Sequence, residues 1–297
     1  MLLLTGATGS VGTALLRRLT EAAVPVRCLV RDPRRLREQR VKVQIALGDL
    51  GDPRSFRHAL RGVQTVVHLA SAIRDQPSGS IEELVAVATY RLVQAAERAG
   101  AQRFLYFSTL GASTYSRARL MRAKAVAERA VIESSLAQTV FAPSVIYAPG
   151  DPYLTLLERL SALPVMAIPG SGKASFQPIW AQDVADCVLA TLPGGALAES
   201  SIGCRYELAG PQQLTHRQIV ELALRSFGRR RPMVGIPVGL ARPALKLVAR
   251  LRGPAAFATW DEAELLEVPL LARDGASDAR RLLGSEPRPM GEVLGAG

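Results

Sequence analysis

Residues 5–12 read Thr5-Gly6-Ala7-Thr8-Gly9-Ser10-Val11-Gly12, a glycine-rich turn between an apolar run at residues 2–4 and a helical pattern at residues 11–21. Glycines at this spacing allow a tight turn, a close approach of backbone to a phosphate, and close packing of the helix on the strand. The amino terminus of the helix adds N–H donors and the positive end of its dipole. A glycine motif alone is weak evidence, but a strand before it and a helix after it favour a phosphate-binding turn.

The segments after this turn alternate between short apolar runs and longer helical patterns. Apolar runs that predict strands occupy residues 2–5, 26–30, 65–70, 103–108 and 137–141. Helical patterns occupy residues 11–21, 53–60, 82–98 and 120–134. Strands that alternate with helices of this length predict an α/β fold with a doubly wound, parallel Rossmann sheet.

The alternation stops after Pro149-Gly150-Asp151-Pro152, which marks a domain boundary. We expect residues 1–150 to form the Rossmann domain and residues 175–210, with a helix and a strand of their own, to rejoin its sheet. Residues 151–174 and 211–297 then remain for a small, discontinuous carboxyl-terminal lobe, which would bind a substrate or a partner.

Length and composition are those of an ordinary globular protein. A chain of 297 residues with 48% hydrophobic and 21% charged residues can bury a full core and is not expected to be disordered. Cys28, Cys187 and Cys204 lie far apart, so we expect neither a metal site nor a disulfide framework, and a reducing cytoplasm fits best. An apolar strand that starts at Met1 argues against a secretory signal, and no apolar run is long enough to span a bilayer.

Positive charge is concentrated in two blocks of a chain whose formal net charge is +11. One block follows the second predicted strand and contains Arg31, Arg34, Arg35, Arg37, Arg40 and Lys42. The other contains Arg229, Arg230, Arg231, Arg242, Lys246, Arg250 and Arg252. Such blocks attract polyanions or anionic membrane surfaces, although charge runs are more often only solvated faces. We expect no specific nucleic-acid partner.

Residues 240–252 of the second block have the pattern of a basic amphipathic helix. Arg242, Lys246 and Arg250 recur every four residues, while apolar side chains fill another face. Such a helix either lies on an anionic membrane or packs on the lobe with its basic face in water, and the second arrangement is the commoner one. The protein is therefore expected in the cytoplasm, with the inner face of the membrane or a respiratory complex as an alternative site of association through this helix.

The end of the second predicted strand bears on the choice of cofactor. The chain reads Cys28-Leu29-Val30-Arg31-Asp32 there, with Arg34 and Arg35 close behind. A carboxylate at this place binds the ribose 2′-hydroxyl of NAD, whereas an arginine accommodates the 2′-phosphate of NADP. Arg31, with Arg34 or Arg35 as a second contact, favours NADP(H), and Asp32 keeps NAD(H) open.

Through the glycine-rich turn, the end of the second predicted strand and the segments that follow, the chain resembles the extended and atypical short-chain dehydrogenase/reductase superfamily over nearly its whole length. Gly48-Asp49-Leu50 resembles the turn in which Asp49 would bond the adenine amino group, residues 66–72 the strand segment that walls the cofactor, and residues 142–147 the run beside the nicotinamide. The resemblance implies cofactor contacts from Gly6, Thr8, Gly9, Ser10, Val11, Gly12, Arg31, Arg34, Asp49, Leu50, Ala70, Ser71, Ala72, Lys124, Pro143 and Val145.

Only half of the superfamily's proton-transfer pair is present. In that superfamily a tyrosine four residues before a lysine, on the same helical face, acts as the general acid and base. Lys124 matches the lysine, but Leu120 stands at the tyrosine position. Ser108, at the end of the strand predicted at residues 103–108, matches the active-site serine, so Lys124 and Ser108 are the candidate catalytic residues. We expect Tyr115 to be a surface tyrosine and His68 a buried structural histidine.

The chain keeps the cofactor-binding motifs but lacks the tyrosine of the proton-transfer pair. In this it resembles the branch that contains the nucleotide-binding accessory subunit of respiratory complex I. The segment at residues 208–215 also resembles that branch. In that branch NADP(H) is a structural or sensing ligand. The co-regulators related to nitrogen-metabolite repression are a second sensing branch. Three functions follow: a cofactor-holding protein at a membrane complex, an NAD(P)-dependent reductase, epimerase or isomerase of a small carbonyl or quinone compound, and a redox-sensing regulator.

Overall fold

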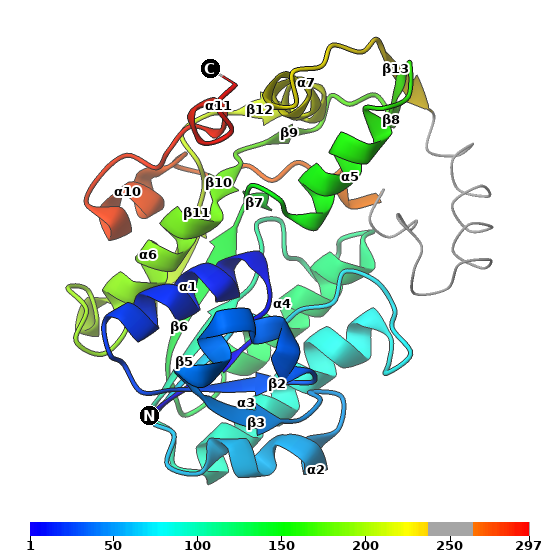
Figure 1. The fold of residues 1–297 in the computed structure, drawn as a ribbon. Coiled ribbons are helices and arrows are strands. Elements are labelled where there is room, and N and C mark those ends of the chain that lie inside the picture. Colours follow the sequence, from blue (N-terminus) through cyan, green and yellow to red (C-terminus); the bar gives the residue numbers. More distant parts are fainter. Residues whose placement is uncertain (237–263, 297) are drawn as a thin grey trace.

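A seven-stranded parallel sheet forms the centre of the protein, of which the computed structural model describes residues 1–236 and 264–296 (Figure 1). The strands lie in the order β11-β6-β5-β4-β1-β2-β3, and each neighbouring pair is parallel. Their bounds are β1 (Leu2–Thr5), β2 (Val26–Val30), β3 (Gln44–Leu47), β4 (Thr65–His68), β5 (Arg103–Phe107), β6 (Ala137–Pro143) and β11 (Arg205–Leu208). The strand order reverses between β1 and β4, where open α/β sheets bind their ligands.

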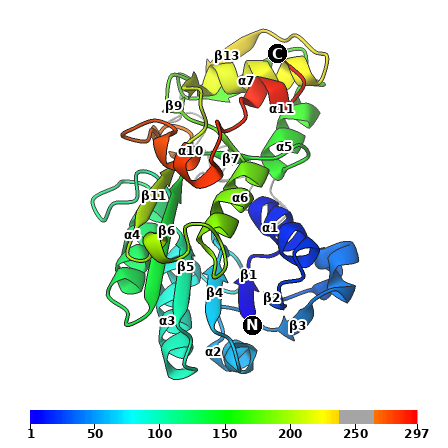
Figure 2. The same ribbon diagram turned by 90° about the vertical axis from the view of Figure 1, so that its left-hand side faces the viewer.

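Helices cover both faces of this sheet (Figure 2). One face carries α1 (Ser10–Glu21) and α6 (Ala181–Thr191), and the other carries α2 (Pro53–Phe56), α3 (Ala88–Arg98) and α4 (Arg119–Ile132). The side chains of β1 divide between the faces, since Leu4 packs in the cluster of α1 and α6 whereas Leu3 packs in the cluster of α3 and α4. Burial on both faces is typical of a parallel sheet, and the predicted α/β, doubly wound architecture is confirmed.

The helix α1 is held against α6 by apolar packing and one ion pair. Leu15, Leu16 and Leu19 are buried in the cluster that also contains residues of α6. Arg18 of α1 donates to both carboxylate oxygens of Asp186 on α6, at 2.8 and 3.3 Å. Because the glycine-rich turn leads directly into α1, this packing fixes the helix whose amino terminus closes the turn.

A smaller lobe lies beyond the carboxyl ends of the strands (Figure 1). Its elements are β7 (Ile146–Tyr147), α5 (Pro152–Leu160), β8 (Met166–Pro169), β9 (Ser175–Phe176), β10 (Ile179–Trp180), β12 (Leu214–Thr215), α7 (His216–Ser226), β13 (Met233–Ile236) and α11 (Met290–Val293). A further helix, α10 (Ser277–Leu283), packs on α6 and β11. The strands pair as β10 with β7, β12 with β9 and β13 with β8. The domain boundaries proposed from the sequence stay a prediction.

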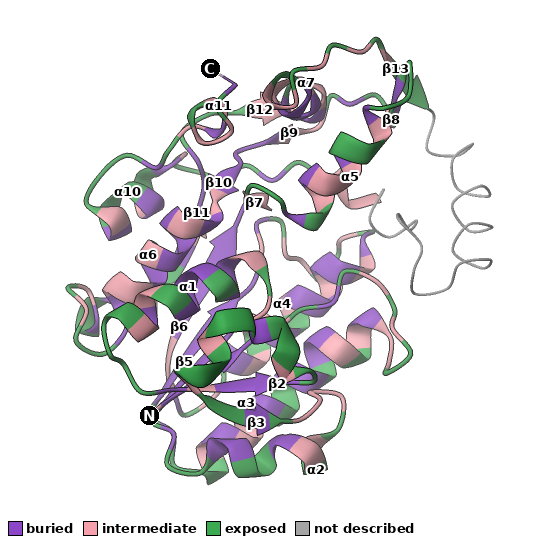
Figure 3. Ribbon diagram, in the orientation of Figure 1, coloured by how far each residue is buried: buried purple, intermediate pink, exposed green. Residues whose placement is uncertain are grey.

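Several helices and strands differ from those that the sequence pattern predicts. The helix expected at residues 53–60 divides into α2 and a 3₁₀ helix, η2 (Arg57–Leu60), and the one expected at residues 82–98 begins with a π-helical turn, η3 (Glu83–Val87). Two further 3₁₀ helices are η1 (Pro33–Val41) and η4 (Glu199–Ser201). The edge strand β3 was not among the predicted strands, although three of its four residues are apolar; it exposes all of them but Ala46 (Figure 3).

The basic segment at residues 240–252 lies outside the described residues, so the expected amphipathic helix remains a prediction. Among residues 1–236 and 264–296, no helix has the length and apolar character needed to cross a bilayer.

Candidate functional site

The glycine-rich turn forms a cradle between β1 and α1. Gly6 has a φ of +73°, which favours glycine, and a Cβ there would lie 2.6 Å from the backbone nitrogen of Ala70. A Cβ on Gly12 would lie 2.1 Å from the carbonyl oxygen of Gly6. A Cβ on Gly9 would meet only that same oxygen, at 3.5 Å, among the atoms described. Gly6 and Gly12 thus close the turn, while Gly9 leaves the open approach that a pyrophosphate needs.

The amino terminus of α1 supplies the donors of this cradle. Gly9 is the N-cap residue and has no side chain with which to cap the helix. The N–H groups of the first helical turn lack intrahelical partners, and the positive end of the helix dipole lies beside them. Together with the open approach at Gly9, this donor set fits the pyrophosphate of a dinucleotide.

Charged side chains at the ends of β2 and β3 lie where the adenosine half would bind. Arg31 donates from Nη1 to Oε1 of Gln76 at 3.0 Å, and the same Nη1 lies 4.0 Å from Oδ2 of Asp49. The side chain of Arg31 is 57% exposed. The carboxylate of Asp32 instead accepts from the backbone nitrogen of Arg34 at 3.0 Å, because Asp32 is the N-cap residue of η1. Arg31 is thus presented outward, whereas Asp32 serves to start a helix.

The turn after β3 is also held by local hydrogen bonds. Asp49 accepts from the backbone nitrogen of Gly51 through Oδ1, at 2.9 Å, while its backbone nitrogen donates to the hydroxyl of Ser55 at 2.8 Å. Oδ2 of Asp49 is therefore the oxygen left for a ligand or for Arg31. Arg34 lines a shallow basic hollow on η1 together with Arg37, Glu38, Arg40 and Val41.

The lysine of the candidate catalytic pair is buried in the middle of α4. Lys124 is 5% exposed, and its Nζ donates to the carbonyl oxygen of Phe107 at 2.5 Å and lies 5.3 Å from the ring centre of Tyr106. Burial lowers the pKa of Lys124 to about 7, and the Glu128 carboxylate opposes this shift. One turn earlier, Leu120 is 9% exposed and belongs to the apolar cluster of this face of the sheet. A buried hydrocarbon side chain therefore stands four residues before Lys124.

The candidate serine has a different partner from the lysine. Ser108 is 3% exposed, and its hydroxyl donates to the carboxylate of Glu128. Glu128 also accepts from Nε of Arg205 at 2.7 Å, and Arg205 donates to Glu207 at 3.1 Å. Lys124 donates to the carbonyl oxygen of Phe107, the residue before Ser108, so Lys124 and Ser108 are neighbours. Their side chains nevertheless have different hydrogen-bond partners. The pairing of Ser108 with Glu128 was not foreseen from the sequence.

His68 and Tyr115 occupy the environments expected for them. Nδ1 of His68 lies 2.7 Å from the hydroxyl of Thr5, and Nε2 lies 3.0 Å from the hydroxyl of Thr89. Because the Thr89 hydroxyl donates to the carbonyl of Val85 at 2.6 Å, it accepts from Nε2, and Thr5 donates to Nδ1. Burial, with a smaller effect of nearby Lys124, lowers the pKa of His68 to about 3, so the imidazole is neutral. Tyr115 is 95% exposed.

The other residues predicted to contact a cofactor share one edge of the sheet. They follow the carboxyl ends of β1, β3, β4 and β6, and they are Thr8, Ser10, Val11, Leu50, Ala70, Ser71, Ala72, Pro143 and Val145. Lys124 reaches the same edge from α4 through the carbonyl of Phe107, the last residue of β5. The individual cofactor contacts remain predictions.

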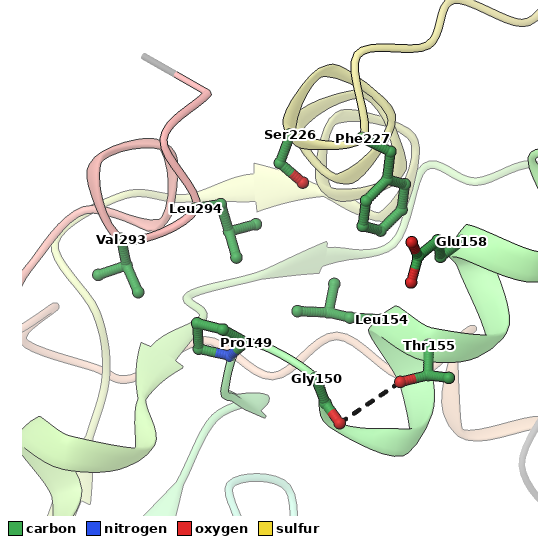
Figure 4. A pocket seen from close by; sticks show the side chains of 9 residues that line it. All are labelled: Pro149, Gly150, Leu154, Thr155, Glu158, Ser226, Phe227, Val293 and Leu294. Atoms are coloured by element: carbon green, nitrogen blue, oxygen red, sulfur yellow. Dashed lines mark hydrogen bonds between the residues drawn. The ribbon is translucent and has the colours of Figure 1, made fainter.

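A separate hollow lies in the lobe between α5, α7 and α11 (Figure 4). Its lining residues are Pro149, Gly150, Leu154, Thr155, Glu158, Ser226, Phe227, Val293 and Leu294. None of the residues predicted to contact a cofactor is among them, so this hollow is distinct from the cradle.

Comparison with known proteins agrees with the geometry of the cradle, which fits a dinucleotide. The sequence profile of the NAD(P)H-binding family matches residues 6–192, which is more than half of the chain. An NAD(P)H azoreductase of Xenophilus azovorans is 29% identical over 257 residues, which cover 82% of this chain and 80% of that protein. Subunit 9 of the NADH dehydrogenase alpha subcomplex of Arabidopsis thaliana is 29% identical over 236 residues, which cover 73% of this chain but only 55% of that protein.

Solved structures share the fold at lower sequence identity. The NADPH-dependent quinone oxidoreductase of Escherichia coli, complexed with NADPH, has a TM-score of 0.75 at 20% identity, and the alignment covers 99% of each chain. Because the family match runs from the glycine-rich turn to the end of the helix that packs on α1, this chain belongs to the NAD(P)H-binding family, within the atypical short-chain dehydrogenase/reductase superfamily.

Proposed function

We propose that this protein holds NADP(H) in the glycine cradle as a structural or sensing ligand and lacks the proton-transfer apparatus of the carbonyl-reducing members of its superfamily. The observation that carries the proposal is Leu120, a buried leucine four residues before the buried Lys124. General acid and base assistance is worth about 10²- to 10⁴-fold in rate, and a hydrocarbon side chain provides none of it.

Lys124 retains a binding role in this proposal. The bound cofactor would supply a hydride. Lys124, whose Nζ donates to the carbonyl oxygen of Phe107, would also donate a hydrogen bond to the nicotinamide ribose. A lysine whose pKa is about 7 is only partly charged at neutral pH, and a hydroxyl of the cofactor would accept from either protonation state.

The preference for NADP(H) over NAD(H) rests on the end of β2. Arg31 presents an exposed guanidinium, which suits a 2′-phosphate, whereas the carboxylate of Asp32 is occupied at the start of η1. In an NAD-binding site of this type that carboxylate would instead bind the ribose 2′-hydroxyl, and the contact with Arg34 uses one of its two oxygens.

A second candidate is an NADPH-dependent reductase of acceptors that take their protons from water. The similarity to an azoreductase and the shared fold with a quinone oxidoreductase favour it. Association with a respiratory complex is supported by the similarity to subunit 9 of NADH dehydrogenase in Arabidopsis, of which this chain spans about half, and in Rattus norvegicus.

The test separates cofactor binding from turnover. We expect the purified protein to bind NADPH yet to show negligible oxidation of it by simple aldehydes and ketones. Leu120→Tyr should then create measurable carbonyl reduction, because it places a phenol four residues before Lys124. Leu120→Phe is the matched control, since both variants add a ring to a packed cluster at a cost of about 1 to 3 kcal/mol but only one adds the hydroxyl.

Two results would decide against the proposal. Rapid turnover of carbonyl compounds by the natural protein, abolished in Lys124→Ala, would show a catalytic site that works without the tyrosine. Rapid turnover of quinones or azo compounds with no carbonyl activity would favour the second candidate.

A further inference from the structure

The loop after β4 reaches the guanidinium that faces the adenosine half of the cradle. Gln76, in this loop, accepts from Nη1 of Arg31 at 3.0 Å, although the two residues are 45 positions apart. We propose that Gln76 is a positioning residue that sets cofactor choice by holding Arg31 ready for a 2′-phosphate. This inference rests on the proposed preference for NADP(H).

The loop that carries Gln76 is braced by its own hydrogen bonds. Gln76 and Gly79 exchange backbone hydrogen bonds of 2.9 and 3.0 Å. The carboxylate of Asp75 accepts from the backbone nitrogen of Ile81 at 2.8 Å and from Arg119, at the start of α4, at 3.0 Å. A glutamine on such a loop has a defined place, so it can fix the position of a mobile partner.

The neutral amide suits this task better than a charged group would. Arg31 is a long, half-exposed side chain, and restricting it before a ligand arrives lowers the ordering cost of binding. A guanidinium has five N–H donors, and Gln76 engages Nη1 without cancelling its charge. The remaining donors stay available for the paired oxygens of a phosphate.

Gln76 also competes with a nearby acid for Arg31. Nη1 of Arg31 lies 4.0 Å from Oδ2 of Asp49, which is longer than a charge-assisted hydrogen bond. Without Gln76, the guanidinium could close on Asp49 and form an ion pair that opposes phosphate binding. The hydrogen bond to Gln76 therefore keeps Arg31 available for phosphate and leaves Oδ2 of Asp49 available for the adenine amino group.

The experiment measures the ratio of the NADH and NADPH dissociation constants by titration of the full-length protein. In Gln76→Ala we expect the preference for NADPH to fall about 5- to 10-fold, the usual size of one ordinary hydrogen bond, with NADH affinity unchanged within about twofold. Gln76→Glu should lower the preference further, because a carboxylate pairs with Arg31 and repels the phosphate. Gln102→Glu, before β5 at the opposite edge of the sheet, is the charge-matched control and should leave the ratio unchanged.

The role through Arg31 is tested in a double variant. In the Arg31→Ala background, which should itself erase most of the preference, Gln76→Ala should change the ratio by less than about twofold, because the residue that it positions is gone. A full effect of Gln76→Ala in that background would overturn the proposal, as would equal weakening of both cofactors in the single variant.

The failure of this inference differs from the failure of the proposed function. If the natural protein binds NADH and NADPH equally, the proposed NADP(H) preference is wrong, and the inference fails with it. If the natural protein prefers NADPH and Arg31→Ala removes the preference while Gln76→Ala and Gln76→Glu keep it, only the inference is wrong.

Discussion

The glycine cradle and the first turns of α4 lie at the same edge of the sheet but are built in opposite ways. The cradle is backbone: Gly6 and Gly12 are packed against neighbouring main chain, and donors at the start of α1 remain without intrahelical partners. The α4 side is packed side chain, with Leu120 in an apolar cluster and Lys124 buried beside Tyr106. In the proposed function, cofactor binding would depend on the first of these parts and proton transfer on the second, so that one can be lost while the other is kept.

The largest expected effect concerns the buried amine of Lys124. Its pKa of about 7 in the folded protein lies below its ordinary value of 10.5, so the unfolded chain binds more protons between these values. The free energy of unfolding should therefore rise by about 3 kcal/mol between pH 7 and 9.5. In Lys124→Met this rise should be missing, as measured by urea unfolding at a series of pH values.

The matched control for this measurement is Lys173→Met, which removes an exposed lysine. Its pH dependence should follow that of the natural protein. Parallel curves for Lys124→Met and the natural protein would show that the amine is not held in a pKa-lowering environment.

The cradle is tested by two glycines whose surroundings differ. In Gly9→Val, the side chain enters the phosphate approach, so we expect at least a hundredfold loss of NADPH affinity, about 2.7 kcal/mol, with little change in the melting temperature. In Gly12→Ala, the Cβ meets backbone at 2.1 Å, so both affinity and stability should fall. If the two variants lost equal stability, Gly9 would be a packing residue like Gly12 and not an opening for the phosphate.

The smallest expected effect concerns the acid that links Ser108 to Arg205. Glu128→Gln leaves both partners with a neutral acceptor, which should cost about 1 to 2 kcal/mol of stability at neutral pH. Because the Glu128 carboxylate raises the pKa of Lys124, the variant should also move the lysine's titration to lower pH. An unchanged or raised midpoint of the pH-dependent unfolding curve would contradict this coupling.

The sequence predicted those parts of the fold that local pattern determines. The glycine spacing located the cradle, and apolar runs located β1, β2, β4, β5 and β6 because these strands are buried on both faces. The edge strand β3 was not predicted, although Ile45, Ala46 and Leu47 are apolar. Only the resemblance of the following turn, at Asp49, implied a third strand there.

The side-chain partners within the site were beyond the reach of local pattern. Gln76 bonds Arg31 from 45 positions away, and Glu128 bonds Ser108 from a helix that follows a different strand. No periodicity or motif marks Gln76, because its contact depends on the course of an irregular loop. Glu128 lies four residues after Lys124, but spacing along a helix does not show which strand residue its carboxylate meets.

The packing of α1 on α6 has a consequence for the folding of the chain during its synthesis. The helix that closes the cradle, at residues 10–21, is made well before the residues that cover it, at 181–191. Until then Leu15, Leu16 and Leu19 lack part of their apolar cover, and the nascent chain carries a surface that invites chaperones or aggregation. A fragment of residues 1–150 would contain every predicted cofactor contact and still lack α6. In the proposed function, all the cofactor-contacting residues are therefore present in the nascent chain before the helix that packs on α1 is made.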